Sequence, residues 1–295
     1  MYVTYCRINF KECQNLYFVK DLSLFKEILK FSGWTFLGSS ASIASNQGLN
    51  ILFNTFFGVT LNTAYGISSQ ISQAVNSFIT NFQTAFRPSI IKTYANNQKE
   101  NLYMLICNTS LFSFFLIFIL SFPLMLNINY ILNLWLGNKF PVQTPLFCIF
   151  FFLHNWIEVI SAPLWMAIQA SGNIKFYQLS VSLTLILNII ISYTLFKNGY
   201  SAYYAFIVKI LLDTICFYIR LYFTKLYIGL NLLDYSKRVF LKIILFFLFN
   251  LIIIYPIVNN FEELHRLLCS IILTFFITLP SYSLSIYFSS TTIRY

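Results

Sequence analysis

Charged residues are scarce in this chain. They make up only 9% of its 295 residues, and nine Asp and Glu stand against nineteen Lys and Arg, whereas a typical soluble domain is about a quarter charged. Short catalytic and ligand motifs are missing as well, including GxGxxG, the P-loop, HExxH, GxSxG and CxxC. An ordinary soluble domain is thereby excluded. We expect neither an enzyme nor a protein that holds a metal or a cofactor.

Hydrophobic residues are correspondingly abundant. They account for 58% of the chain, with 34 Phe and 20 Tyr, and they fall into long runs. A helix needs about 20 apolar residues to cross a bilayer, and only helices or closed barrels satisfy their backbone in lipid. Residues 241–254 are apolar on every face apart from Lys242 and Asn250, which favours helices over the alternating strands of a barrel. The sequence therefore predicts an all-α, polytopic transmembrane helix bundle.

The hydrophobic runs predict about eight spans. They cover roughly residues 33–57, 63–86, 105–126, 143–167, 176–196, 201–223, 239–258 and 267–288. With eight spans both termini lie on one side, and fifteen of the nineteen Lys and Arg fall on that side. Basic loops stay in the cytoplasm, so we expect cytoplasmic termini. The same bias accounts for the net charge of +10 without any nucleic-acid partner.

Residues 21–31 place Leu22, Phe25, Ile28 and Leu29 on one helical face, with charged residues opposite. This pattern predicts an amphipathic helix. It either lies on the membrane surface or leads as an ordinary solvated helix into the first span.

Polar side chains form stripes along the first two predicted spans. In the first span the stripe recurs every four residues and comprises Ser42, Asn46, Asn50 and Asn54; in the second it comprises Ser69, Gln73, Asn76, Thr80, Gln83 and Arg87. Amides at membrane depth must face protein or water. Stripes of this length favour a hydrated cavity for a hydroxyl-rich ligand such as a sugar. The alternative is hydrogen bonding between packed helices.

Ionisable residues also occur inside the spans. His154 and Glu158 lie one turn apart on one face near the middle of one span. They form either a proton or cation coupling site or a structural pair, and Glu158 could also bond to a neighbouring helix. Lys209 and Asp213 are also one turn apart, and we expect them to neutralise each other. Arg87, at the cytoplasmic end of its stripe, either binds a phosphate or simply follows the orientation rule.

Three stretches carry a resemblance to a known family. They are GWTFLGSSASIASNQGLNILFNTFFGVTLNTAYGISSQISQAVNSFITNFQTAFRPSIIKTYA at 33–95, ILNLWLG at 131–137 and IQASGNIKFYQ at 168–178. Together they resemble polysaccharide-export flippases of the Wzx type, which serve lipopolysaccharide and O-antigen biosynthesis and share a superfamily with multidrug and toxin extruders. The similarity spans roughly residues 5–225.

The resemblance implies two lobes of six helices around a central cavity, of which this chain matches the second lobe; six preceding helices are missing. Residues 1–31 would then be a cytoplasmic linker, 32–225 the six-helix lobe and 226–295 two additional helices. It also implies that the protein flips an undecaprenyl-diphosphate-linked oligosaccharide across the bacterial inner membrane. Its partners would be that lipid-linked oligosaccharide, membrane lipids and a separate chain that supplies the other lobe.

The stripe residues receive roles from this hypothesis. Asn46, Asn50, Asn54, Gln73, Asn76 and Gln83 would contact the glycan, Arg87 the diphosphate, and Glu158 with His154 a coupling ion. A cation-coupled antiporter of the same superfamily and a nonfunctional fragment remain the alternatives.

Overall fold

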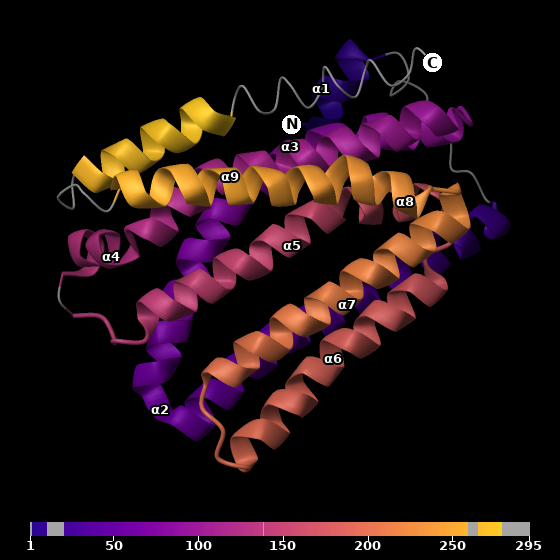
Figure 1. Ribbon diagram of the computed structural model, residues 1–295. Helices are drawn as coiled ribbons and strands as arrows, with labels where there is room; N and C mark the ends of the chain where they lie inside the picture. The colour runs from indigo at the N-terminus through magenta and orange to yellow at the C-terminus, as the bar shows by residue number, and fades with distance from the viewer. Residues whose placement is uncertain (1, 11–20, 138, 259–264, 279–295) are drawn as a thin grey trace.

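The computed structural model describes residues 2–10, 21–137, 139–258 and 265–278 of the chain. Within these ranges every regular element is a helix and no strand occurs (Figure 1). The prediction of an all-α protein is therefore confirmed for the described part of the chain.

The longest element, α2 (Leu22–Ala95), supplies two arms that meet at a sharp bend. The bend is at Gly58, whose φ of 76° and ψ of −176° lie outside the helical region. Only glycine adopts such angles without strain. The arms correspond to the predicted spans 33–57 and 63–86, but the structure has a single non-helical residue where the sequence predicted a five-residue connection.

The predicted amphipathic segment forms the beginning of α2. Asp21 caps it by accepting hydrogen bonds from the backbone N–H groups of Ser23 and Leu24. The helix then runs without interruption into the first arm, as expected of a helix that leads into a span. Leu22 and Phe25 are exposed, so this end of α2 stands clear of the bundle.

Helix α5 packs against several of the other helices. In chain order the helices are α1 (Tyr2–Asn9), α3 (Lys99–Leu126), α4 (Ile128–Leu136), α5 (Thr144–Ala170), α6 (Lys175–Lys197), α7 (Tyr203–Ile228), α8 (Leu232–Tyr235), the π-helix η2 (Ser236–Phe240), α9 (Leu241–Val258) and a last helix, His265–Thr278. Helix α5 contacts α2, α3 and α7, while α6 contacts α2 and α7. In Figure 1, α5 passes between α3 and the antiparallel α6–α7 pair.

Within the described part of the chain, three helices are long and apolar enough to cross a membrane, namely α3, α5 and α6. This agrees with a membrane bundle in general terms. The number of eight spans stays a prediction. Helices α2 and α7 carry more polar residues than these three, and the end of the predicted span 267–288 lies outside the described residues.

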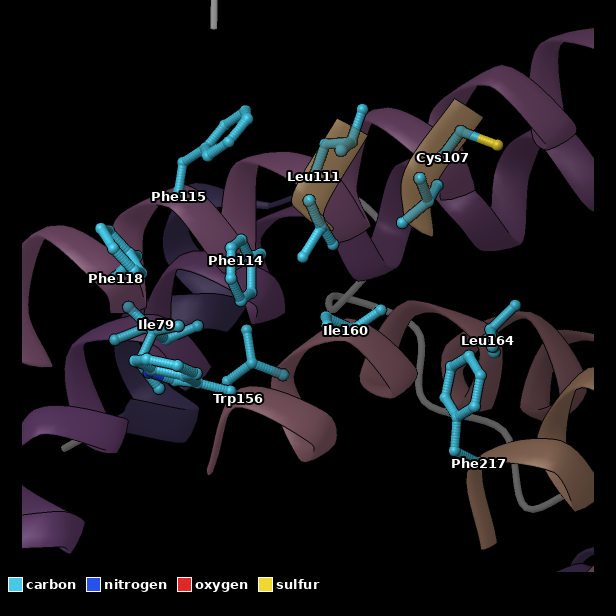
Figure 2. Packing of buried hydrophobic residues seen from close by; sticks show 14 of the residues in the cluster. Ile79, Cys107, Leu111, Phe114, Phe115, Phe118, Trp156, Ile160, Leu164 and Phe217 are labelled. Atoms are coloured by element: carbon cyan, nitrogen blue, oxygen red, sulfur yellow. The ribbon is translucent and has the colours of Figure 1, made fainter. Parts of the chain in front are cut away.

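An aromatic core holds α3, α5, α9 and the second arm of α2 together. Phe118 is fully buried; its ring centroid lies 5.5 Å from that of Trp156 and 5.0 Å from that of Phe246. Trp156 also donates to Ser121 Oγ at 2.7 Å. Figure 2 shows Phe114, Phe118 and Trp156 side by side with Ile79. This packing fixes one side of α5 and leaves its opposite side for the cavities.

Candidate functional site

Two adjoining cavities run along one side of α5. The first, of about 610 Å³, is bounded by the first arm of α2 and by α5, α6 and α7, with Arg87 from the second arm. The second, of about 420 Å³, lies between the two arms of α2 and α5. Both cavities are lined by Asn46, His154, Glu158 and Lys209. These four side chains therefore form a junction between the cavities, and the pair extends along most of α5.

Six of the nine predicted site residues occupy the second cavity or the junction. Asn50, Gln73 and Asn76 line the second cavity, where Gln73 Nε2 donates to Ser69 Oγ at 2.9 Å. Asn46, His154 and Glu158 belong to both cavities, and Arg87 lines the first. Parts of the two stripes thus meet at one polar surface.

Gln83 is placed differently from the other stripe residues. Its side chain is buried and its Nε2 donates to the carbonyl oxygen of Val159 on α5 at 2.9 Å. It lines neither cavity. Gln83 thus makes a hydrogen bond between packed helices, which is the arrangement considered as the alternative.

Asn54 also stands apart from the cavities. Its side chain is exposed near the end of the first arm and lines neither cavity. The cavity wall on this arm ends at Asn50, because Phe53 and Tyr65 stack at 4.8 Å and close the space toward the bend. The part of this stripe that lines the cavity therefore ends at Asn50, one turn before the end of the stripe predicted from the sequence.

Other polar contacts hold the walls in place. Asn155 Nδ2 on α5 donates to Ser72 Oγ on α2 at 2.8 Å, and Ser68 Oγ donates to the carbonyl oxygen of Thr144 at 3.1 Å. The amides and hydroxyls of this bundle therefore divide into two groups: one joins the helices, and the other faces the cavities.

Glu158, His154 and Asp213 lie in a line across the junction. His154 Nδ1 is 2.5 Å from Asp213 Oδ2, and His154 Nε2 is 3.5 Å from Glu158 Oε2. The predicted proximity of His154 and Glu158 is thus observed. The side chains of His154 and Asp213 are 14% and 15% exposed, whereas that of Glu158 is 47% exposed. Only the outer carboxylate has room to move.

Among the described residues Lys209 and Asp213 form no direct ion pair with each other, although the charge of Lys209 still acts on the Asp213 carboxylate. Asp213 bonds to His154 on α5, and Lys209 Nζ donates to Asn46 Oδ1 on α2 at 3.4 Å. Each side chain of the expected i, i+4 pair finds its partner on another helix. The packing between helices explains this difference. Because α7 packs against other helices, Lys209 and Asp213 have partners on those helices within reach as well as each other.

Basic groups gather where the first cavity reaches the ends of α5 and α7. Arg87 donates to Gln169 Oε1, and Arg220 donates to Ser161 Oγ and, at 3.0 Å, to Tyr177 Oη. From the sequence, Arg220 was only one of the fifteen basic residues assigned to the cytoplasmic side, because nothing in its spacing showed that α6 would place Tyr177 opposite it. Three basic side chains, Arg87, Lys209 and Arg220, face this cavity against two carboxylates.

Two buried amide oxygens in the cavity walls have no partner among the described residues. They belong to Gln178 in the first cavity and to Asn76 in the second. A buried carbonyl oxygen without a hydrogen bond is unfavourable, so both positions suit a donor such as a hydroxyl or a water molecule. The site as a whole can accept and donate many hydrogen bonds, and it can hold an anionic group at its basic end.

The chain matches no protein-family model, no curated protein and no solved structure.

Proposed function

We propose that the protein spans the membrane as a bundle of about eight helices and moves a lipid-linked oligosaccharide from one side to the other. The observation that carries the proposal is the pair of adjoining polar cavities along α5, which share Asn46, His154, Glu158 and Lys209. Polar side chains at membrane depth require protein or water around them. A hydrated route bordered by amides and hydroxyls suits a sugar better than an apolar cargo.

The two ends of the route suit the two parts of such a cargo. Asn50, Gln73 and Asn76 offer donors and acceptors to glycan hydroxyls in the second cavity. Arg87 and Arg220 offer guanidinium groups to the diphosphate in the first cavity, where planar N–H pairs match phosphate oxygens. Binding at an interface between helices and exposing it alternately to each side is how two-lobe transporters work.

Orientation and partners belong to the same proposal. We place the termini in the cytoplasm of a bacterium, with the lobe at 32–225 in the inner membrane and two further helices after it. The side chains of Asn46 and Gln73 are exposed on the surface of the bundle. An amide that faces lipid is costly, so this surface should be covered. A second lobe from a separate chain would cover this face and complete the cavity.

Reconstitution tests the proposal directly. The chain is purified together with any second chain that stays bound to it and is placed in proteoliposomes with an undecaprenyl-diphosphate oligosaccharide in both leaflets. The vesicles are then treated with an external glycosidase. We expect the protein to raise the cleaved fraction from about half toward completion, because cargo from the inner leaflet reaches the outside. Cleavage that stops at about half, as in protein-free vesicles, would contradict the proposal.

A cation-coupled antiporter is the second candidate, and Glu158 and Asp213 in the first cavity favour it. The three basic side chains in the same cavity oppose the binding of a cationic drug. Proton release on adding a cationic drug to these proteoliposomes, without any movement of the oligosaccharide, would support the antiporter instead.

A further inference from the structure

Asp213 on α7 reaches across to His154 on α5, and His154 in turn reaches Glu158 one turn further along its own helix. The separations are 2.5 Å from Asp213 Oδ2 to His154 Nδ1 and 3.5 Å from His154 Nε2 to Glu158 Oε2. His154 and Glu158 border both cavities, whereas Asp213 borders the first. The histidine ring therefore connects a mostly buried carboxylate to one that opens into the junction.

The two contacts of the ring constrain where hydrogen atoms lie. A carboxylate only accepts hydrogen bonds, so the contact with Asp213 places a hydrogen on His154 Nδ1. A neutral imidazole then presents a bare lone pair at Nε2. That lone pair repels a carboxylate at 3.5 Å. The observed approach of Glu158 is favourable when one more proton is present, either on Nε2 or on the Glu158 carboxyl group.

We propose that Asp213 is a positioning residue that holds His154 with Nδ1–H turned toward α7, so that Nε2 and Glu158 share one exchangeable proton at the junction. This inference rests on the proposed transport function and gives it a site for proton coupling. Transfer of the proton from Nε2 to Oε2 leaves the total charge of the three groups unchanged. Its release from Glu158 to cavity water leaves the lone pair facing a carboxylate, and the half-exposed Glu158 side chain then moves away.

The charged groups around this line are held by partners of their own. On α7, Lys209 donates to Asn46, and Arg220 donates to Tyr177 of α6 and Ser161 of α5. On α2, Arg87 donates to Gln169. The charges of Lys209 and Arg220 also act on the Asp213 carboxylate, but among the described residues its close polar contact is with His154. It can orient the His154 ring much as a buried carboxylate orients a catalytic histidine.

The chain contains two histidines, which makes the tautomer measurable. The variant His265→Gln leaves His154 as the single histidine. Its ring nitrogens are labelled with ¹⁵N in bilayer nanodiscs, and their chemical shifts report which nitrogen carries hydrogen. We expect a protonated Nδ1 in this parent. In the added variant Asp213→Asn the amide can donate to Nδ1, so the ratio of Nδ1–H to Nε2–H should fall about tenfold or more.

Two matched variants complete the test. Asp234→Asn removes an exposed carboxylate on α8 and should leave the ratio unchanged. Glu158→Gln should keep Nδ1–H, because the Gln amide can donate to Nε2. Equal ratios in Asp213→Asn and its parent would overturn the proposal. A neutral ring protonated at Nε2 in the parent would also overturn the proposal. This result needs no variant at position 213, so the proposal can be tested even if Asp213→Asn does not fold.

The transport assay separates this inference from the function it rests on. Slower oligosaccharide movement in Asp213→Asn than in Asp234→Asn, together with the altered tautomer, supports both. An altered tautomer in a protein that moves no oligosaccharide supports the positioning role and refutes the proposed cargo.

Discussion

Gly38 lies directly against Gln178, which joins the first arm of α2 to α6. A Cβ atom at position 38 would fall 1.3 Å from Gln178 Nε2 and 2.3 Å from its Cδ. Gln178 is 6% exposed, and its side chain would have to shift from this buried position to make room for a Cβ. Both residues line the first cavity. This wall of the cavity thus depends on the absence of a side chain at position 38.

Gly38→Ala should therefore destabilise the protein. Overpacking a tight contact costs about 1–3 kcal/mol, and we expect a loss in this range in thermal unfolding followed in detergent. Gly33→Ala is the matched control, because nothing lies within 4 Å of a Cβ at that position of the same helix. Equal unfolding temperatures for the two variants would contradict the contact. Adding Gln178→Ala to Gly38→Ala should recover part of the loss.

The two glutamines of one sequence stripe should respond in opposite ways to replacement by leucine. Gln83→Leu removes the buried hydrogen bond to Val159 and should lower the free energy of unfolding by about 0.5–1.5 kcal/mol. Gln73→Leu alters an exposed cavity wall and should change stability by less than about 0.5 kcal/mol while reducing transport. Unfolding curves and the glycosidase assay measure both effects. A large stability loss at 73 with none at 83 would refute this division.

Helical periodicity could predict that these glutamines share a stripe, but not which of them would be buried. Gln83 follows Asn76 by seven residues, or about two turns, so these two side chains project in nearly the same direction. Steps of three and four residues link Gln73 to the same stripe. What separates them is the neighbour: α5 lies close to Gln83 and diverges from Gln73 enough to leave a cavity. Helix crossing depends on packing between segments about 80 residues apart, which no local pattern records.

The aromatic core makes a third prediction. Phe118 is fully buried among Phe122, Trp156 and Phe246, so Phe118→Ala should lower the free energy of unfolding by about 3–5 kcal/mol. Phe78→Ala is the control, because Phe78 is 64% exposed on the second arm of α2. Thermal unfolding of the two variants provides the comparison. Similar losses would show that the aromatic cluster is not the core of the bundle.

The beginning of α2 should depend on pH through its cap. Hydrogen bonds from Ser23, led by its hydroxyl, and from the Leu24 amide hold the pKa of Asp21 below its usual value of 3.8. Because the folded pKa is lower than the unfolded one, the cap contributes fully above the unfolded value and is lost as the pH falls through the folded value. Protection of the segment 21–31 against hydrogen exchange, measured relative to the intrinsic rate at each pH, should therefore fall only in that acidic range.

The variant Asp21→Ala should exchange faster in this segment at neutral pH and lose most of the acid response. Unchanged exchange in the variant would show that the cap does not stabilise the beginning of the helix. This cap could be expected from the sequence alone, because an Asp before an amphipathic run is a local signal.

The ionisable pairs mark the limit of such local signals. His154 and Glu158 lie four residues apart on one helix, so their proximity could be predicted from the sequence. Asp213 was assigned to Lys209 by the same rule, yet it bonds to His154, which lies 59 residues away. An i, i+4 spacing shows which side chains can meet, whereas the packing of α7 against α5 determines which of them do.

The central claim is that the cavity walls are wet while the outer face of α6 is in lipid. Single cysteines at Asn46 and Gln73 on the walls, and at Leu183 and Ile190 on exposed apolar positions of α6, can be probed in intact membranes with a membrane-impermeant maleimide added to either side. We predict labelling at 46 and 73 and none at 183 and 190. Unreactive cysteines at 46 and 73, or equal reactivity at 183 and 190, would contradict the account.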